Sequence, residues 1–195
     1  MKDIILLGAG GHCKSVIDVI EQENKYKIKG VIDNNPDLKN TTILDYGIIG
    51  TDLDLKKISK TIKFALITVG QIKSPLERIK LYNLAVDLGF ELPTITSPLA
   101  YVSKYAGVGI GTIVMHHSIV NANSYVGKNC IINSKALIEH DCVIKDHCHI
   151  STSANINGNV HVEQGVFIGS NSTIKESIKI KKNSFIKAGS LIKYI

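Results

Sequence analysis

The sequence predicts a chain in two parts, an α/β unit over residues 1–96 followed by a parallel β-solenoid over residues 97–195. Two observations carry this prediction. The first half opens with an apolar strand, a glycine-rich turn and an amphipathic stretch, which is the order of a Rossmann-like nucleotide-binding unit. The second half places a branched apolar residue at every sixth position, and a fixed period of this kind marks a repeat architecture.

The six-residue period is unbroken through the second half. Steps of six from Val102 to Ile192 give sixteen positions, and all sixteen hold Val or Ile. Two residues before these positions, thirteen of the sixteen hold Ala, Ser, Thr or Cys; the exceptions are Val160, Val166 and Ile178. One branched and one small inward residue suit a short strand and a tight corner. Three units would make a triangular coil, and sixteen units about five coils stacked at strand spacing.

The first half reads as a small parallel sheet with helices. "DIILLG" predicts a strand near residues 3–8, and a helix should follow from about His12 to Glu23. "YKIKGVID" predicts a second strand that ends in Asp33. Further along, "FALITVG" predicts a third strand, "PLERIKLYNLAVDLG" a helix and "FELPTI" a last short strand before the solenoid.

The glycine-rich turn predicts a phosphate site at the start of the first helix. Gly8, Gly10 and Gly11 would let backbone N–H groups approach a phosphate, with His12 directly after them. Asp33 stands where such a unit places an acid on a ribose. A complete dinucleotide fold needs two such halves, and the first part has room for one. We therefore expect a nucleoside-diphosphate ligand rather than NAD; the alternative is a tight turn without a ligand.

Composition excludes several classes. Aromatic residues make up 6% of the chain and Trp is absent, which disfavours base-stacking platforms for nucleic acid. The net charge of +6 suits an anionic small molecule. The apolar run "IILLGA" is too short for a membrane span or a signal peptide. Four cysteines without an export signal predict reduced thiols and a cytoplasmic protein.

The six-residue phase also sorts the polar residues of the second half. Cys130, Cys142 and Cys148 stand at the small inward position, so we expect them to fill the core. Six histidines stand at neither inward position and should point outward, namely His116, His117, His140, His147, His149 and His161.

A "GAGGH" unit followed by this repeat resembles the sugar O/N-acetyltransferase family of the NeuD and PglD type. The likeness covers nearly the whole chain, and "IEHDCVI" followed by "HCHIS" is its most specific part. The resemblance implies a left-handed β-helix, a homotrimer, and acetyl transfer from acetyl-CoA. We expect N-acetylation of a UDP-linked 4-amino-4-deoxy sugar in bacterial glycan biosynthesis. O-acetylation of a sialic or nonulosonic acid is the alternative within the family.

The resemblance assigns catalytic roles to the middle coils. It makes His140 the general base and Asp141 the residue that orients its imidazole. Asn133 and His149 would line the pocket for the acceptor and the acetyl group, and the Gly158 amide would contact the acetyl carbonyl. Direct transfer then needs no acyl-enzyme and no metal. In solenoid carbonic anhydrases two zinc histidines lie five residues apart, and no histidine pair here has that spacing.

The resemblance also implies two binding surfaces. The residues expected to bind the nucleotide sugar are Gly8, Gly10, Gly11, His12, Asp33, Asn34 and Gly70. Those expected to bind acetyl-CoA are Gly158, Gly169, Ser170 and Ala188. Family chains usually continue past "AGSLI" into a "GVPAK"-like segment near the coenzyme, whereas this sequence ends at "KYI". An inactive scaffold that binds a sugar nucleotide is therefore the alternative from another class.

Spacing predicts that the site lies between subunits. Eighteen residues, one whole coil, separate His140 from Gly158, so the glycine amide should lie beside the base. Nine residues, half a coil, separate His140 from His149, which places these two on different sides of the solenoid. Asn133 and His149 are nearly one coil apart and should be neighbours. One subunit would supply His140, Asp141 and Gly158, and the next would supply Asn133 and His149.

Overall fold

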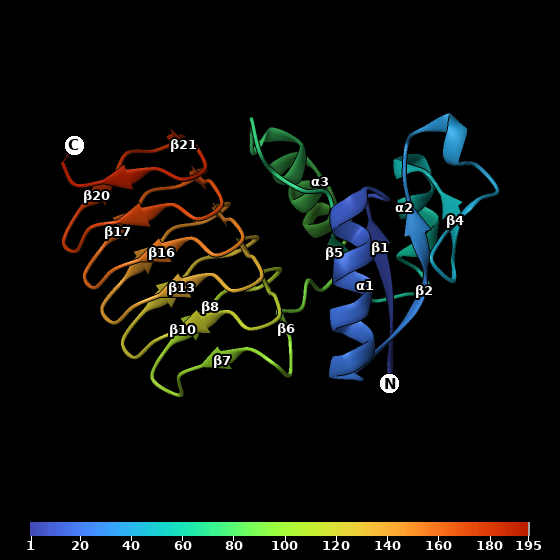
Figure 1. Cartoon of the computed structure of the whole chain (residues 1–195). Helices are drawn as coiled ribbons and strands as arrows, with labels where there is room; N and C mark the ends of the chain where they lie inside the picture. Colours follow the sequence, from blue (N-terminus) through green and yellow to red (C-terminus); the bar gives the residue numbers. More distant parts are fainter. Residues whose placement is uncertain (195) are drawn as a thin grey trace. The chain divides into compact units, whose positions relative to one another are not determined.

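The computed structural model describes residues 1–194 and divides into two compact units (Figure 1). The first unit holds Met1–Gly70 and Leu76–Pro93. The second unit holds Gln71–Pro75 and the chain from Thr94 onward. The short segment 71–75 therefore belongs to the second unit, although in the sequence it lies between two parts of the first unit.

The first unit is built on a five-stranded sheet in the order β3-β4-β2-β1-β5. All neighbouring strands run parallel except β3 and β4, which form an antiparallel hairpin. The strands are β1 Lys2–Leu7, β2 Tyr26–Ile32, β3 Thr42–Ile43, β4 Tyr46–Gly50 and β5 Phe64–Ile67. The helices are α1 Gly11–Glu23, α2 Leu55–Ile58 and α3 Leu76–Asp87, with 3₁₀ turns η1 Pro36–Leu38 and η2 Asp52–Asp54.

The centre of this sheet is buried on both faces, as a parallel sheet requires. Ile4, Ile5, Leu6 and Leu7 of β1 are fully buried. The chain leaves β1 through Gly8, whose φ of +110° favours glycine. A Cβ at Gly8 would also clash with the Val69 side chain, so the turn needs a residue without one. The β3–β4 hairpin and α2 were not predicted from the sequence.

The second unit confirms the predicted parallel solenoid. Its two-residue strands form three sheets, and each strand pairs in parallel with the strand eighteen residues away, as Ile119 does with Leu137. The strands are β6 Ile95–Thr96, β7 Tyr101–Val102, β8 Gly107–Val108, β9 Ile113–Val114, β10 Ile119–Val120, β11 Tyr125–Val126, β12 Ile131–Ile132, β13 Leu137–Ile138, β14 Val143–Ile144, β15 His149–Ile150, β16 Asn155–Ile156, β17 His161–Val162, β18 Phe167–Ile168, β19 Thr173–Ile174, β20 Lys179–Ile180, β21 Phe185–Ile186 and β22 Leu191–Ile192.

The period-six residues fill the solenoid core as the sequence predicts. Twelve consecutive repeat positions, from Val114 to Ile180, are at most 1% exposed. The terminal positions Val102 and Ile192 are only partly covered. The segment "FELPTI" does not form a single strand: Glu91 makes an isolated parallel bridge to Phe64 of β5, and only the last residue, Ile95, enters a solenoid sheet, as the start of β6.

A second six-residue series forms the corners and was not predicted. Three residues before most branched positions, the backbone adopts positive φ, as at Asn123, Asp141 and Asn159 with φ of 57–61°. Asn, Asp and Gly enter this left-handed region at the lowest cost, which explains their recurrence in the turns. Within residues 1–194, no helix is both long and apolar enough to cross a membrane.

Candidate active site

His140 and Asp141 form a hydrogen-bonded pair at the corner between β13 and β14. Asp141 Oδ2 lies 2.7 Å from His140 Nδ1. One coil earlier, Asn123 Nδ2 donates to Asp141 Oδ1 at 2.6 Å, so both carboxylate oxygens have a partner. A carboxylate accepts, so Nδ1 carries the proton and Nε2 presents a lone pair. This is the arrangement that a general base needs.

The electrostatics of the pair agree with this assignment. The hydrogen bond to Asp141 raises the pKa of His140 above its ordinary value. The pKa of Asp141 is lowered, first by the hydrogen bond from Asn123 and then by the bond to His140. Asp141 is therefore ionised at neutral pH, where it orients the imidazole and increases its basicity.

Gly158 lies directly beside the imidazole, one coil further along. A Cβ at Gly158 would lie 2.7 Å from His140 Cε1 and 2.8 Å from Nε2, so the ring occupies the space that a side chain would need. The Gly158 N–H donates to no acceptor within residues 1–194, while its carbonyl accepts from Ser177 N at 3.0 Å. The predicted neighbourhood of base and glycine amide is thus present within one chain.

Asn133 and His149 form a second group on a different sheet. His149 begins β15, and its Nε2 lies 3.1 Å from Asn133 Nδ2. On the other side of the ring, Nδ1 faces the carbonyl oxygen of Gln71. The Gln71 side chain donates to the His147 carbonyl at 3.0 Å. His147 and His149 point away from the solenoid core as predicted, but they are 7% and 6% exposed. Contact with Gln71 is one reason that they are not solvated.

The expected coenzyme residues fall into both groups. Gly169 directly follows β18, and Asn133 directly follows β12. The two strands are two coils apart in the same sheet, so the two residues lie along the same edge. A Cβ at Gly169 would lie 2.5 Å from Ala188 N, so these two residues are in close contact. Ser170 Oγ lies 3.0 Å from Ser151 Oγ on the same edge. Gly158, by contrast, lies with His140.

Asp33 directly follows β2, and its carboxylate accepts two backbone hydrogen bonds. Asp33 Oδ2 accepts from Ala9 N at 2.7 Å, and Oδ1 accepts from Asn35 N at 2.8 Å. The carboxylate therefore ties the end of β2 to the turn after β1. Gly10 and Gly11 border open space, since no atom lies within 4 Å of a Cβ built on either.

The other expected nucleotide residues lie around the same edge. A Cβ at Gly70 would lie 3.7 Å from His12 Cβ, so these two residues are neighbours. Asn34 and Asp52 form a reciprocal pair: Asn34 Nδ2 donates to Asp52 Oδ2 at 2.6 Å, and Asp52 N donates to Asn34 Oδ1 at 3.0 Å. The predicted contact of Asn34 with a ligand must therefore compete with this pair.

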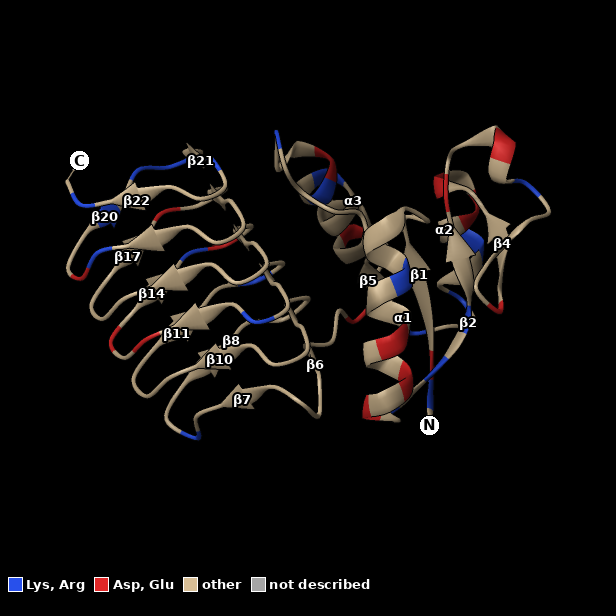
Figure 2. Cartoon of the chain, in the orientation of Figure 1, with Lys and Arg blue, Asp and Glu red and all other residues tan. Residues whose placement is uncertain are grey.

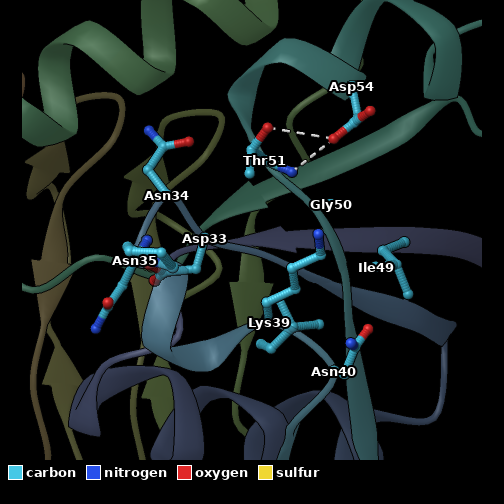
Figure 3. Close-up of a pocket in the computed structure, with 11 residues that line it drawn as sticks. Asp33, Asn34, Asn35, Lys39, Asn40, Ile49, Gly50, Thr51 and Asp54 are labelled. Carbon is cyan, nitrogen blue, oxygen red and sulfur yellow. Dashed lines mark hydrogen bonds between the residues drawn. The ribbon is translucent and has the colours of Figure 1, made fainter.

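A cavity of about 430 Å³ adjoins Asp33 (Figure 3). This cavity was not predicted, because part of its wall is strand β4, which no sequence pattern indicated. Thr51 N and Oγ1 both donate to Asp54 Oδ2, at 2.8 and 3.2 Å, which fixes one side of the opening. The exposed Lys39 is the cation among the lining residues, which are Asp33, Asn34, Asn35, Pro36, Lys39, Asn40, Ile48, Ile49, Gly50, Thr51 and Asp54.

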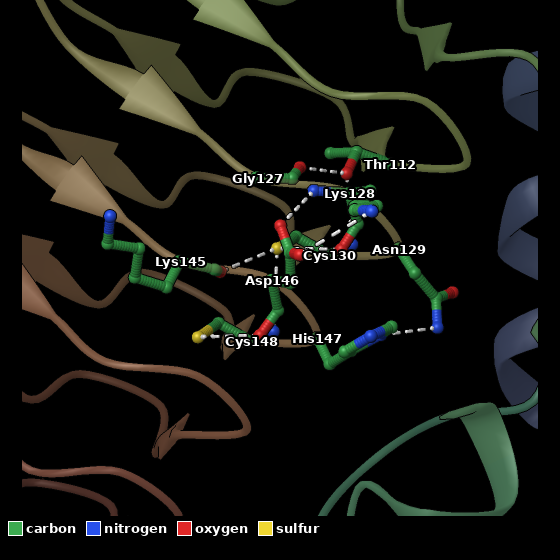
Figure 4. Close-up of polar contacts among 9 residues, drawn as sticks. All are labelled: Thr112, Gly127, Lys128, Asn129, Cys130, Lys145, Asp146, His147 and Cys148. Atoms are coloured by element: carbon green, nitrogen blue, oxygen red, sulfur yellow. Dashed lines mark hydrogen bonds and ion pairs between the residues drawn. The ribbon is translucent and has the colours of Figure 1, made fainter.

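The cysteines of the solenoid are core residues. Cys130, Cys142 and Cys148 are fully buried. Their thiols donate to backbone carbonyls, as Cys148 Sγ does to Glu163 O at 3.1 Å. Figure 4 shows the corresponding bond from Cys130 Sγ to Lys145 O, which is 3.3 Å long. Burial raises the pKa of Cys142 and of Cys148, which disfavours a thiolate nucleophile. No cluster of three or more His, Cys, Asp or Glu suited to a metal ion occurs among residues 1–194.

The last coils carry an exposed basic surface. Figure 2 shows basic segments around β20, β21 and β22. Lys179 is paired with Glu163 at 2.9 Å. The remaining exposed lysines could attract the phosphates of an anionic co-substrate; they are Lys181, Lys182, Lys187 and Lys193.

Comparisons with known proteins match both units. The PglD N-terminal domain family matches residues 3–83, and the hexapeptide repeat of succinyl-transferase matches residues 159–193. A point variant of the perosamine N-acetyltransferase from Caulobacter crescentus, solved with CoA and GDP-perosamine, is 26% identical. The match covers 99% of this chain and 89% of that chain, with a TM-score of 0.92.

Two further relatives are informative. The acetyltransferase domain of PglB from Neisseria gonorrhoeae, solved with acetyl coenzyme A, is 27% identical. That match covers 98% of this chain and 92% of that chain, with a TM-score of 0.89. Uncharacterized protein L142 of Acanthamoeba polyphaga mimivirus is 31% identical over 124 residues, which is 64% of this chain. The matched part spans 23% of the length of that viral protein.

Proposed function

Because the chain belongs to the NeuD/PglD-type sugar acetyltransferase family, we propose that it N-acetylates a UDP-linked 4-amino-4-deoxy sugar with His140 as general base. Its fold is the left-handed parallel β-helix of these acetyltransferases, preceded by a small α/β unit. It is an acetyltransferase, and acetyl-CoA is its co-substrate. The identity of the nucleotide, the role of His140 and the trimer are parts of the proposal.

The observation that carries the proposal is the arrangement of His140, Asp141 and Gly158. A sugar amine must be neutral to attack a thioester. As the amine nitrogen bonds to the acetyl carbon, His140 Nε2 removes its proton while Asp141 holds Nδ1–H. The Gly158 N–H is suited to stabilise the oxyanion that develops on the acetyl oxygen. The C–S bond then breaks, and the proton passes from His140 to the sulfur of CoA.

A trimer would complete this site. His140 lies at a corner beside β13, whereas His149 lies on β15, which belongs to another of the three sheets. The two groups therefore face different sides of one solenoid. A site shared between neighbouring subunits would join His140 of one chain to Asn133 and His149 of the next. Sedimentation equilibrium should show a trimer, and a fully active monomer would remove this part of the proposal.

The nucleotide would bind at the carboxyl edge of β1 and β2, around Asp33 and the open turn of Gly10 and Gly11. The helix N-terminus there favours a phosphate. Each carboxylate oxygen of Asp33 keeps a lone pair for a ribose hydroxyl beyond its backbone partner. One solved relative was crystallised with GDP-perosamine, so a GDP-linked amino sugar is the alternative that this observation favours.

A panel of acceptors tests the function. Release of CoA from acetyl-CoA would be measured with UDP-linked 4-amino sugars, GDP-perosamine and free nonulosonic acids. We expect the highest kcat/KM with a UDP-linked amine. Preference for GDP-perosamine would correct the nucleotide, and activity only on a nonulosonate hydroxyl would favour O-transfer. Nucleotide binding without CoA release from any acceptor would indicate an inactive scaffold.

A further inference from the structure

A chain of hydrogen bonds runs from Gln71 through His149 to Asn133, and its two ends are backbone groups. At one end, the Ser134 N–H donates to Asn133 Oδ1 at 2.8 Å. At the other end, His149 Nδ1 faces the Gln71 carbonyl oxygen. A backbone N–H can only donate and a backbone carbonyl can only accept. The two ends therefore fix the direction of every bond between them.

The direction determines the proton position on His149. Because Oδ1 of Asn133 faces a donor, its Nδ2 is the atom that lies 3.1 Å from His149 Nε2. Nδ2 is a donor, so Nε2 must present a lone pair. Nδ1 then carries the proton, which matches its carbonyl partner on Gln71. His149 is held as the neutral Nδ1–H tautomer, and a second ring proton would point at the Asn133 amide.

Gln71 is built to hold its carbonyl in this place. The residue is 1% exposed, while its neighbours Ile72 and Lys73 are exposed. Its Nε2 donates to the His147 carbonyl at 3.0 Å. The side chain thereby anchors segment 71–75 on the solenoid two residues before His149 in the sequence.

We propose that Gln71 is a positioning residue that fixes the tautomer of His149 and thereby makes Asn133 the hydrogen-bond donor to a substrate oxygen. One N–H of Asn133 is used by His149, and the other is available for an acetyl carbonyl or a sugar hydroxyl. His149 in this state offers the substrate no N–H from Nε2. The inference rests on the proposed function for its catalytic meaning, but the tautomer is a property of the protein alone.

Nitrogen-15 NMR of the full-length protein, labelled at histidine, tests the tautomer directly. We expect His149 to show a protonated Nδ1 and an unprotonated Nε2 at neutral pH. The opposite tautomer, a doubly protonated ring or averaging between tautomers would overturn the inference. If the wild type shows the expected tautomer but acetylates no acceptor, the proposed function fails and the positioning role of Gln71 in the fold stands.

Variants separate the positioning role from simple stability. Asn133→Asp keeps an acceptor for the Ser134 N–H but places an oxygen in front of His149 Nε2, so this nitrogen should acquire a proton. The variant also loses one preorganised hydrogen-bond donor, and kcat should therefore fall by about 10²-fold. Asn183→Asp is the matched control, because Asn183 is an exposed corner residue with φ of 58° that Asp tolerates. It should leave the ring signals and kcat unchanged.

Gln71→Ala tests the anchor itself. We expect mixed tautomer signals for His149 and a loss of about five-fold in kcat, on the scale of one hydrogen bond. Lys73→Ala, in the same segment, should change neither. A rise in KM for acetyl-CoA alone would identify the acetyl carbonyl as the partner of Asn133, and a rise in KM for the sugar would identify a hydroxyl. A lower melting temperature with wild-type ring signals and kinetics would overturn the inference.

Discussion

Replacement of Gly158 by Ala is the sharpest perturbation of the proposed site. The added methyl would lie 2.7 Å from His140 Cε1 and 2.8 Å from Nε2, whereas carbon atoms pack best at about 3.5–4.0 Å. The imidazole must therefore move by about 1 Å. Its side chain is 63% exposed, so the ring can move without a cost to the core. A displacement of this size at a reacting group can reduce the rate by about 10²-fold.

The expected result is thus a fall of about 10²-fold in kcat with little change in melting temperature. CoA release can be followed with a thiol reagent, because the four cysteines of the protein are buried. Gly107→Ala is a matched control: its Cβ would lie 3.1 Å from the Tyr125 ring one coil away, and its strand β8 lies two coils from β14. Equal losses in the two variants, or wild-type turnover in Gly158→Ala, would refute the placement of the base against Gly158.

The pH dependence of the rate, the buried thiols and the nucleotide site can each be tested separately. Activity should rise as pH increases through the pKa of His140, which Asp141 raises. Asp141→Asn should shift this limb of the pH–rate profile to lower pH and reduce kcat. A limb that does not move would contradict the pairing of His140 with Asp141. Cys142→Ala should keep wild-type turnover, with or without a chelator. The core cavity that it leaves should lower the free energy of unfolding by about 1–2 kcal/mol. An inactive but stable variant would instead indicate a mechanism that uses the thiol. Calorimetry should detect UDP binding that His12→Ala and Asp33→Ala weaken, and binding unaffected by both would move the nucleotide elsewhere.

The solenoid could be predicted in detail because one physical constraint repeats. Each inward position must hold a residue that fits the core, and Val114 to Ile180 satisfy this with almost no exposure. The same constraint correctly placed Cys142 and Cys148 inside and His140 outside. Because one coil has eighteen residues, Gly158 was expected beside His140, and the observed register places it there.

Other features could not be predicted because they depend on segments distant in sequence. The outward phase of His149 suggests an accessible ring, yet Gln71, seventy-eight residues earlier, faces it. No periodicity marks Gln71 as a partner. In the same way, the reciprocal bonds of Asn34 and Asp52 and the cavity beside Asp33 depend on how β4 and its following turn fold back. Asn123, which donates a hydrogen bond to Asp141, lies one whole coil earlier, and the contact can be assigned only once the register of the coils is known.

The central claim is that His140 removes the proton of a sugar amine during acetyl transfer. The most direct measurement is NMR of the product formed from carbon-13 acetyl-CoA and a UDP-linked 4-amino sugar, with wild-type protein and with His140→Ala. The proposed mechanism predicts an amide at the former amine with the wild type, and a rate lower by about 10²–10⁴-fold with the folded variant. An ester product, or an unchanged rate of amide formation by His140→Ala, would contradict it.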